Sequence, residues 1–286
     1  MRNVGIYYAF WCEEWDTDFF PFIKKVKDLG YDQLEINGGT IVSMSEEERR
    51  RLVNEAESQG IVLSYGIGLT SDHDVSSRDE SVRQSGIAFM TEMIKAVGSM
   101  GGGTICGTVY STWPRKLPKG ESKQEYLERS IQSMKILSKV AEQEHVVLLC
   151  EVINRFEQFL LNTCDEALSF VRKVDSPACK ILLDTFHMNI EEDSIEDAIR
   201  NAGVYLGGLH LGECNRKPVG MGRMPWGEIK QALDDIGFIG ALVQEPFILP
   251  GGQVGQDIAV WREVVEQPDL DSLARQSATF IREHLA

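Results

Sequence analysis

Short apolar runs alternate with longer amphipathic stretches from one end of the chain to the other. Each run has the length and the β-branched residues of a buried strand, and a stretch with helical spacing follows it. Eight strands are predicted, over Val4–Ala9, Gln33–Ile36, Ile61–Gly66, Thr104–Gly107, Val146–Glu151, Lys180–Asp184, Tyr205–Leu211 and Ala241–Glu245. Strands that are apolar throughout and separated by helices form parallel sheets. A count of eight favours a closed (β/α)8 TIM barrel over an open doubly wound sheet.

The stretches between the strands predict helices, and the last stretch predicts helix up to the C-terminus. The helices are expected over about Asp18–Leu29, from Ser45 onward, and over Glu80–Met100, Lys123–Glu144, Asp165–Val174, Ser194–Asn201 and Trp226–Ile236. Ser45 and Glu48 form a capping-box pattern, and Gly30 marks a helix end. Gly101-Gly102-Gly103 falls just before a strand, so it indicates a helix end rather than a phosphate-binding loop, which would follow a strand.

No linker rich in Gly, Ser or Pro divides the 286 residues, so we expect one TIM-barrel domain over residues 1–286. The chain has 29 Lys and Arg against 44 Asp and Glu, a formal net charge of −15. This charge argues against a broad nucleic-acid surface or an anionic membrane face, both of which need clustered cations. A small neutral molecule, or a metal cation held by carboxylates, suits it better.

Targeting and redox signals point to a cytoplasmic protein. The N-terminus lacks the apolar stretch of a signal peptide, and no run reaches the roughly 20 apolar residues of a membrane span. The six cysteines are widely spread without a Cys-x-x-Cys pair, which predicts reduced thiols rather than a disulfide framework.

Four consecutive predicted strands carry a charged or imidazole side chain at their carboxyl ends: Glu151, Asp184, His210 and Glu245. Taken singly, a strand-end carboxylate is usually exposed or caps a helix, and a lone histidine is usually part of the core. A barrel, however, brings these ends together around one mouth. Three carboxylates so close would repel one another unless a cation compensated them. The set predicts a site for a divalent ion such as Mn²⁺, Mg²⁺ or Co²⁺.

Glu35, near the end of the second strand, has the same local pattern. The pattern leaves open whether Glu35 binds an ion or supports a residue that does.

Polar side chains also follow three of the four strand ends at short distances. Glu157, His187 and Arg216 lie six, three and six residues beyond the presumed ligands. Each alone could be ordinary loop charge, but their parallel placement favours binding of sugar hydroxyls. Aromatic residues follow the first and fourth strands and could line a sugar pocket or pack in the core; these are Tyr7, Trp11, Trp15 and Trp113.

Four blocks of the sequence closely resemble the ketose 3-epimerases, the D-tagatose 3-epimerase and D-psicose (D-allulose) 3-epimerase enzymes of the xylose-isomerase-like barrel superfamily. The blocks are Glu151-Val-Ile-Asn-Arg-Phe-Glu157, Leu183-Asp-Thr-Phe-His-Met-Asn-Ile-Glu-Glu192, His210-Leu-Gly-Glu-Cys-Asn-Arg216 and Glu245-Pro-Phe247. The resemblance implies one divalent ion per subunit, Mn²⁺ first and Co²⁺ or Mg²⁺ as alternatives, on Glu151, Asp184, His210 and Glu245. It also implies that the substrate contacts Glu157, His187, Arg216, Tyr7, Trp113 and Gly66.

The resemblance further implies the reaction. It predicts epimerisation of free ketohexoses and ketopentoses at C3, such as D-tagatose to D-sorbose and D-fructose to D-psicose. One of Glu151 and Glu245 would remove the C3 proton to give a cis-enediolate, and the other would return a proton to the opposite face. The family suggests a homodimer or homotetramer. Leu211 resembles the tagatose-type enzymes, whereas Asn37-Gly38-Gly39 is unlike either type, so the preferred sugar stays open.

Four other functions are compatible with parts of this pattern. An aldose–ketose isomerase of the same superfamily would use a similar metal site but move the proton between C1 and C2, and a metal-dependent dehydratase of cyclic polyols would release water. A DNA-repair endonuclease on this barrel needs more histidine ligands, several metals and a basic groove, which the charge of −15 disfavours. The full ligand set disfavours a sugar-binding protein without catalysis.

Overall fold

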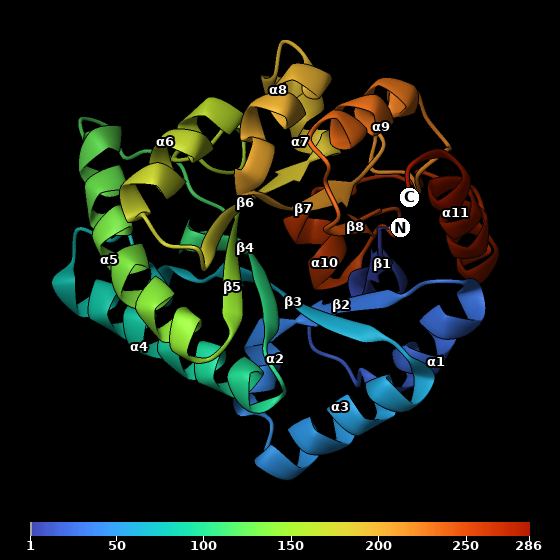
Figure 1. The fold of residues 1–286 in the computed structure, drawn as a ribbon, viewed down its shortest axis with the longest axis horizontal. Helices are drawn as coiled ribbons and strands as arrows, with labels where there is room; N and C mark the ends of the chain where they lie inside the picture. Colours follow the sequence, from blue (N-terminus) through green and yellow to red (C-terminus); the bar gives the residue numbers. More distant parts are fainter. Residues whose placement is uncertain (1) are drawn as a thin grey trace.

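The computed structural model describes residues 2–286, whose strands close into one parallel barrel in sequence order (Figure 1). The strands are β1 (Val4–Tyr7), β2 (Gln33–Asn37), β3 (Val62–Leu69), β4 (Gly103–Thr112), β5 (Val146–Glu151), β6 (Cys179–Asp184), β7 (Leu206–Leu211) and β8 (Ala241–Gln244). The barrel closes where β8 pairs with β1, with Gly5 opposite Val243. The predicted (β/α)8 fold is therefore confirmed.

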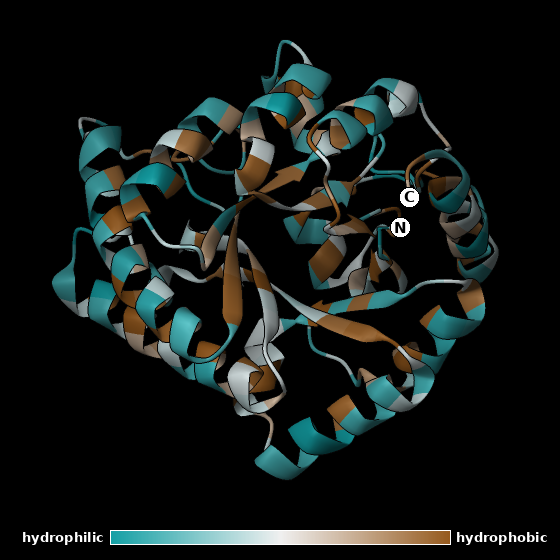
Figure 2. Cartoon of the chain, viewed as in Figure 1, coloured by the Kyte–Doolittle hydropathy of each residue, from teal (hydrophilic) through white to brown (hydrophobic). Residues whose placement is uncertain are grey.

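Helices surround the barrel, and apolar residues gather in the strands and on the helix sides that face them (Figure 2). The helices are α1 (Phe20–Leu29), α2 (Gly38–Ser43), α3 (Glu46–Gln59), α4 (Glu80–Ser99), α5 (Lys123–Gln143), α6 (Cys164–Val174), α7 (Thr185–Glu191), α8 (Ile195–Ala202), α9 (Trp226–Asp235), α10 (Gly252–Asp257) and α11 (Leu270–His284). In α8 the buried residues are Ile195, Ala198, Ile199 and Ala202, which is the spacing of one helix face.

The three predicted signals of helix starts and ends are confirmed. Ser45 and Glu48 form the capping box at the start of α3, and Gly30 ends α1 with φ at 97°. Gly102 also adopts a positive φ, of 83°, and a Cβ there would come within 2.5 Å of the carbonyl oxygen of His145. The glycine cluster therefore ends a helix and lets two chain segments approach closely, as its place before β4 predicts.

Some predicted boundaries are wrong. The first strand ends at Tyr7 rather than Ala9, because Tyr8–Trp11 forms a 3₁₀ turn. The chain after Glu245 is not continuously helical: residues 258–269 separate α10 from α11. Proline cannot continue a helix, and Pro246, Pro250 and Pro268 interrupt this region.

The structure also bears on the predictions about membrane spans and about the cysteines. No helix in residues 2–286 combines the length and the apolar character needed to cross a membrane. All six cysteines are free thiols, as predicted.

Candidate active site

The four strand-end residues meet at one mouth of the barrel. Glu151 and Asp184 are the last residues of β5 and β6, His210 lies in β7, and Glu245 directly follows β8. Each offers one ligand atom, and these four atoms lie within 4.8 Å of one another. The first three residues are buried, and the side chain of Glu245 is 14% exposed. The closed barrel thus brings together four side chains that are widely separated in sequence.

Asp184 both caps a helix and faces the site. Its Oδ1 accepts hydrogen bonds from the backbone N–H groups of Phe186 at 2.6 Å and His187 at 3.4 Å, at the start of α7. Its Oδ2 is buried without a hydrogen-bond partner in residues 2–286 and lies 3.5 Å from Nη1 of Arg216. The cap fixes the carboxylate plane, so the second oxygen is held toward the cluster. Asp184 can therefore cap α7 and contribute to the cluster at the same time.

Burial strongly affects the acids of this cluster. It raises the pKa of Glu245 to about 8, although His210 opposes the shift, and it raises the pKa of Asp184 to about 6 against the opposing effect of Arg216. The negative charge of Glu151 adds to both increases. Carboxylates with such values are only partly compensated by the cations of the protein itself.

The donor set fits a divalent metal ion. Three carboxylates beside one guanidinium, that of Arg216, leave two negative charges, which one divalent cation would neutralise. The unpartnered Oδ2 of Asp184 is an oxygen ligand aimed at the cluster. Three oxygens and one imidazole nitrogen suit hard or borderline divalent ions, and they do not single out one metal.

His210 lies between carboxylates on both of its ring nitrogens. Its Nδ1 is 3.2 Å from Oε1 of Glu151 and 3.9 Å from Oε2 of Glu245, and its Nε2 is 3.0 Å from Oε1 of Glu35. Burial lowers the pKa of His210, but the three glutamates outweigh burial and hold it well above its ordinary value. A metal ion at Nδ1 would therefore take the place of a proton.

The loop residues predicted to bind hydroxyls form a connected group above the cluster. Glu157 accepts hydrogen bonds from Nδ2 of Asn154 at 2.8 Å and from Nε1 of Trp113 at 3.0 Å. Nδ1 of His187 accepts from the backbone N–H of Asn154 at 3.2 Å, so the proton of the neutral ring is on Nε2. Burial and the nearby charge of Arg216 lower the pKa of His187 well below its ordinary value, which keeps the ring neutral.

His187 and Arg216 present two donors to one point. Nε2 of His187 lies 3.3 Å from Nη2 of Arg216, and neither atom can accept the other's proton when the ring is neutral with Nε2–H. An oxygen atom placed beside both would accept from both. This pair is therefore suited to a carbonyl or hydroxyl oxygen.

Arg216 is held in a demanding conformation. Its backbone φ is 61°, in the left-handed region that residues other than glycine seldom adopt, and a hydrogen bond from its N–H to the carbonyl of Glu213 holds the turn. Its guanidinium carbon lies 4.0 Å from the ring centroid of Phe186 and 5.3 Å from that of Phe247. Such backbone strain, of about 1–3 kcal/mol, persists where the surroundings impose it, which is common at functional sites.

A cavity of about 570 Å³ opens above the cluster, within the range of small-molecule sites. Nine of the ten site residues predicted from the sequence line it, namely Tyr7, Gly66, Trp113, Glu151, Glu157, His187, His210, Arg216 and Glu245. Asp184 lies behind them and is fully buried. Trp15 also lines the cavity, whereas Trp11 packs on Phe10 and donates to Asp271 at 2.8 Å, because the 3₁₀ turn directs it elsewhere.

Sequence reasoning missed two contributors. Asn154 orients both Glu157 and His187, and its place three residues before Glu157 was the only signal for it. Phe247, two residues after Glu245, stacks near Arg216.

Comparisons with known proteins agree with one another. The family model of the xylose isomerase-like TIM barrel matches residues 23–266. The D-psicose 3-epimerase of Ruminiclostridium cellulolyticum is 45% identical, over 96% of this chain and 93% of that protein. The D-psicose 3-epimerase of Agrobacterium fabrum is 41% identical, over 97% of each chain. The crystal structure of the D-psicose 3-epimerase from Clostridium cellulolyticum H10 with D-tagatose superposes with a TM-score of 0.96, at 44% identity and 99% coverage of both chains.

Proposed function

Because the chain belongs to the xylose isomerase-like TIM barrels and, within them, to the ketose 3-epimerases, we propose that it inverts C3 of free ketohexoses and ketopentoses with the help of one divalent metal ion. Enzymes of this family are isomerases, and this chain is one of them. The observation that carries the proposal is the group of four ligand atoms within 4.8 Å at the base of the cavity. The names of the relatives favour D-psicose and D-fructose as the first pair to assay.

Glu151, Asp184, His210 and Glu245 would hold the ion, for which Mn²⁺ is the first choice and Co²⁺ or Mg²⁺ are alternatives. When bound, such an ion polarises the C2 carbonyl of the ketose and so acidifies the proton on C3.

Glu151 and Glu245 are the proposed acid and base. They come from β5 and β8, which are not neighbours in the barrel, and so they approach the cavity from different sides. One, as a carboxylate, takes the C3 proton, and the electrons of that bond form the C2–C3 double bond of an enediolate. The other, as a carboxylic acid, gives a proton to the opposite face of C3 while the C2 carbonyl reforms. The two glutamates then have exchanged protonation states, and proton exchange with water resets them.

The remaining residues would hold the sugar in register. The converging donors of His187 and Arg216 suit an oxygen near C2, and Glu157 can accept from a neighbouring hydroxyl. Tyr7 and Trp113 would cover the sugar. Gly66 supports this arrangement, because a Cβ there would come within 3.1 Å of the ring of Tyr7.

The test is incubation of D-fructose in D₂O with added Mn²⁺, followed by NMR of the products. We expect D-psicose with deuterium at C3, because the returned proton comes from a group that exchanges with solvent. Glucose or mannose as the product would instead identify an aldose–ketose isomerase. Exhaustive dialysis against EDTA should remove the activity, and Mn²⁺ or Co²⁺ should restore it. Full activity after that dialysis would contradict the metal requirement.

The absence of a linker predicts one domain, and the family resemblance implies a homo-oligomer. We propose that residues 1–286 act as one domain and that the protein assembles as a homodimer or homotetramer. Light scattering during size-exclusion chromatography tests the assembly, and a monomer at assay concentration would contradict it.

A further inference from the structure

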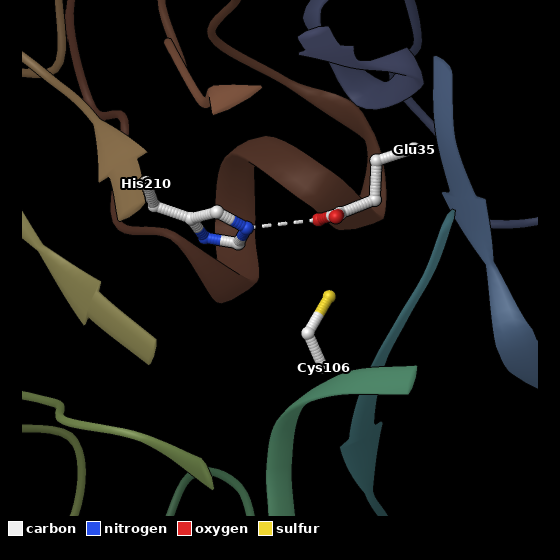
Figure 3. Close-up of side chains that lie close together, drawn as sticks. All are labelled: Glu35, Cys106 and His210. Carbon is white, nitrogen blue, oxygen red and sulfur yellow. Dashed lines mark ion pairs between the residues drawn. The ribbon is translucent and has the colours of Figure 1, made fainter. Parts of the chain in front are cut away.

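Glu35 is a buried acid that the proposed mechanism does not use. It lies on β2 and is 2% exposed. Figure 3 shows its carboxylate pointing across the barrel interior to the ring of His210 on β7. Oε1 of Glu35 lies 3.0 Å from Nε2 of His210. The contact is an ion pair rather than a straight hydrogen bond, and neither atom has a hydrogen-bond partner in residues 2–286. The two atoms therefore depend on each other for compensation.

The two nitrogens of His210 serve different neighbours. Nδ1 faces Glu151 and Glu245, whereas Nε2 faces Glu35. An imidazole that binds a metal through Nδ1 keeps its proton on Nε2, and a carboxylate beside Nε2 selects that tautomer and orientation. Glu35 is placed where such a carboxylate must be.

Glu35 is itself fixed by a buried polar row. Its Oε2 accepts a hydrogen bond from Oγ of Ser64 at 2.9 Å, and Ser64 accepts one from Nε2 of Gln33 at 2.8 Å. Ser64 is 1% exposed and Gln33 is 5% exposed. TIM-barrel interiors are mainly filled by branched apolar side chains, and burying polar groups costs free energy. A row of this kind ending at His210 therefore indicates a task other than packing.

We propose that Glu35 is a positioning residue that holds His210 with Nδ1 toward the metal ion of the proposed function. The inference rests on that function, because it assigns Glu35 a role at the same site. Glu35 also lines the cavity, and in this role it acts through the imidazole of His210 rather than as a ligand of the ion.

Cys106 supplies the competing explanation. Its Sγ points toward the Glu35–His210 contact from β4 in Figure 3, and the three residues place one ligand atom each within 4.8 Å of the others. The thiol itself lies 3.6 Å from the carbonyl oxygen of Tyr65, a weak hydrogen bond. If these three residues formed a separate metal site, Cys106 would be essential to it. If Glu35 positions His210, Cys106 is only a neighbour.

The experiment is titration of metal-depleted protein with Co²⁺, followed by calorimetry and visible absorption. Glu35→Leu keeps the size of the side chain but removes the acceptor, and we expect it to lose about 10- to 100-fold in affinity. Glu35→Gln keeps an oxygen that can accept from Nε2–H, so it should lose less. Cys106→Ser is the matched control inside the same cluster and should bind like the wild type, with one Co²⁺ per chain in every case.

Each outcome has a separate meaning. Wild-type protein that binds no Co²⁺ would remove the proposed metal site, and this inference with it. Wild-type binding together with equal affinity in Glu35→Leu would overturn the positioning role alone. A second Co²⁺ with a thiolate-to-cobalt absorption band, both lost in Cys106→Ser, would overturn it in favour of a separate site. If Glu35→Leu does not fold, Glu35→Asp, which withdraws the carboxylate by one methylene, must show the loss of affinity instead.

Discussion

The two halves of the barrel bring different chemistry to the same cavity. Strands β5 to β8 each carry a candidate ligand at or directly beside their carboxyl ends, whereas two aromatic residues, Tyr7 at the end of β1 and Trp113 directly after β4, line the cavity from the other half. Like charges can be concentrated in one half because one divalent cation, together with Arg216, can compensate all of them. The other half would then shape the proposed sugar pocket. Glu35 on β2, a buried acid of this half, pairs with His210 of the charged half.

This division predicts how variants behave. Removing a group from the charged half should mainly lower kcat and metal affinity, because the group contacts the reacting atoms. Changing an aromatic residue of the other half should mainly raise KM, because it alters binding without touching the proton transfers.

The largest effect is expected for Glu245→Gln. The amide can neither take nor give the C3 proton and is a poorer ligand, so kcat should fall by about 1,000-fold or more, and metal binding should weaken. The measurement is turnover of D-fructose with excess Mn²⁺. Glu283→Gln, at an exposed position on α11, is the control for loss of one negative charge. Wild-type turnover by Glu245→Gln would refute its assignment.

Arg216→Lys tests whether the charged half depends on geometry as well as on charge. Nη1 of Arg216 donates to Glu245 at 3.1 Å while Nη2 lies 3.3 Å from His187, and lysine cannot make both contacts. We expect kcat/KM to fall by about 10- to 100-fold, or about 1.4–2.8 kcal/mol. Arg262→Lys, at an exposed arginine, should change nothing. Equal kinetics for both variants would mean that only the positive charge at position 216 matters.

The meeting of the four strand-end side chains could be predicted because apolar runs mark the strands and the closed barrel decides where their ends meet. Glu151 and Asp184 are the last residues of their strands, as the sequence pattern indicates. The role of Glu35 could not be predicted, because its local pattern is the same as that of a ligand. The contact between Glu35 on β2 and His210 on β7, two strands that are not neighbours in the barrel, is what favours a positioning role over that of a ligand.

Two further points at which the structure goes beyond the sequence-based prediction also have local causes. For Trp11 the sequence left pocket lining and core packing open, and the 3₁₀ turn that follows Tyr7 packs it on Phe10 and away from the cavity. The sequence pattern also presents helix capping and site formation as alternatives for a strand-end carboxylate. In Asp184 one oxygen, Oδ1, caps α7, and the other, Oδ2, faces the cluster. Patterns of residue type cannot show such a division, because it depends on the separate surroundings of the two oxygens.

Trp113→Phe tests the aromatic half. Phenylalanine keeps the ring but loses the 3.0 Å hydrogen bond from Nε1 to Glu157. We expect KM for D-fructose to rise by about three- to tenfold with kcat within about twofold, since the bond is partly exposed and worth about 1 kcal/mol. Trp261→Phe, at a side chain that is 74% exposed, is the control. A large fall in kcat with unchanged KM would show that the two halves are not divided in this way.

The smallest expected effect is that of pH on stability, because the pKa values of the buried acids Glu245 and Glu35 shift in opposite directions in the two halves. In the charged half, burial raises the pKa of Glu245 to about 8, so the folded chain holds this proton more tightly than the unfolded chain. The stabilisation from this bound proton is complete at pH values below the ordinary pKa of glutamate. It is lost as the pH rises through about 8. In the other half, the pKa of Glu35 is lowered: burial opposes the shift, but His210 with Ser64 and Cys106 outweighs it. The ionised Glu35 therefore stabilises the fold at pH values above the ordinary pKa of glutamate, and this stabilisation is lost only in acid.

Between about pH 5 and about pH 8 the metal-depleted protein should thus lose stability, while Glu35 contributes a constant amount. We expect Tm to fall by about 2 °C for each kcal/mol lost. Bound Mn²⁺ would replace the protons of the charged half, so the metal-loaded protein should show a flatter profile, which also controls for general charge repulsion at a net charge of −15. Glu245→Gln should flatten the metal-depleted profile, because it removes the group that titrates in this range. Parallel profiles with and without Mn²⁺ would mean that the ion does not replace these protons, and the difference between the two halves would then not come from the cluster at the strand ends.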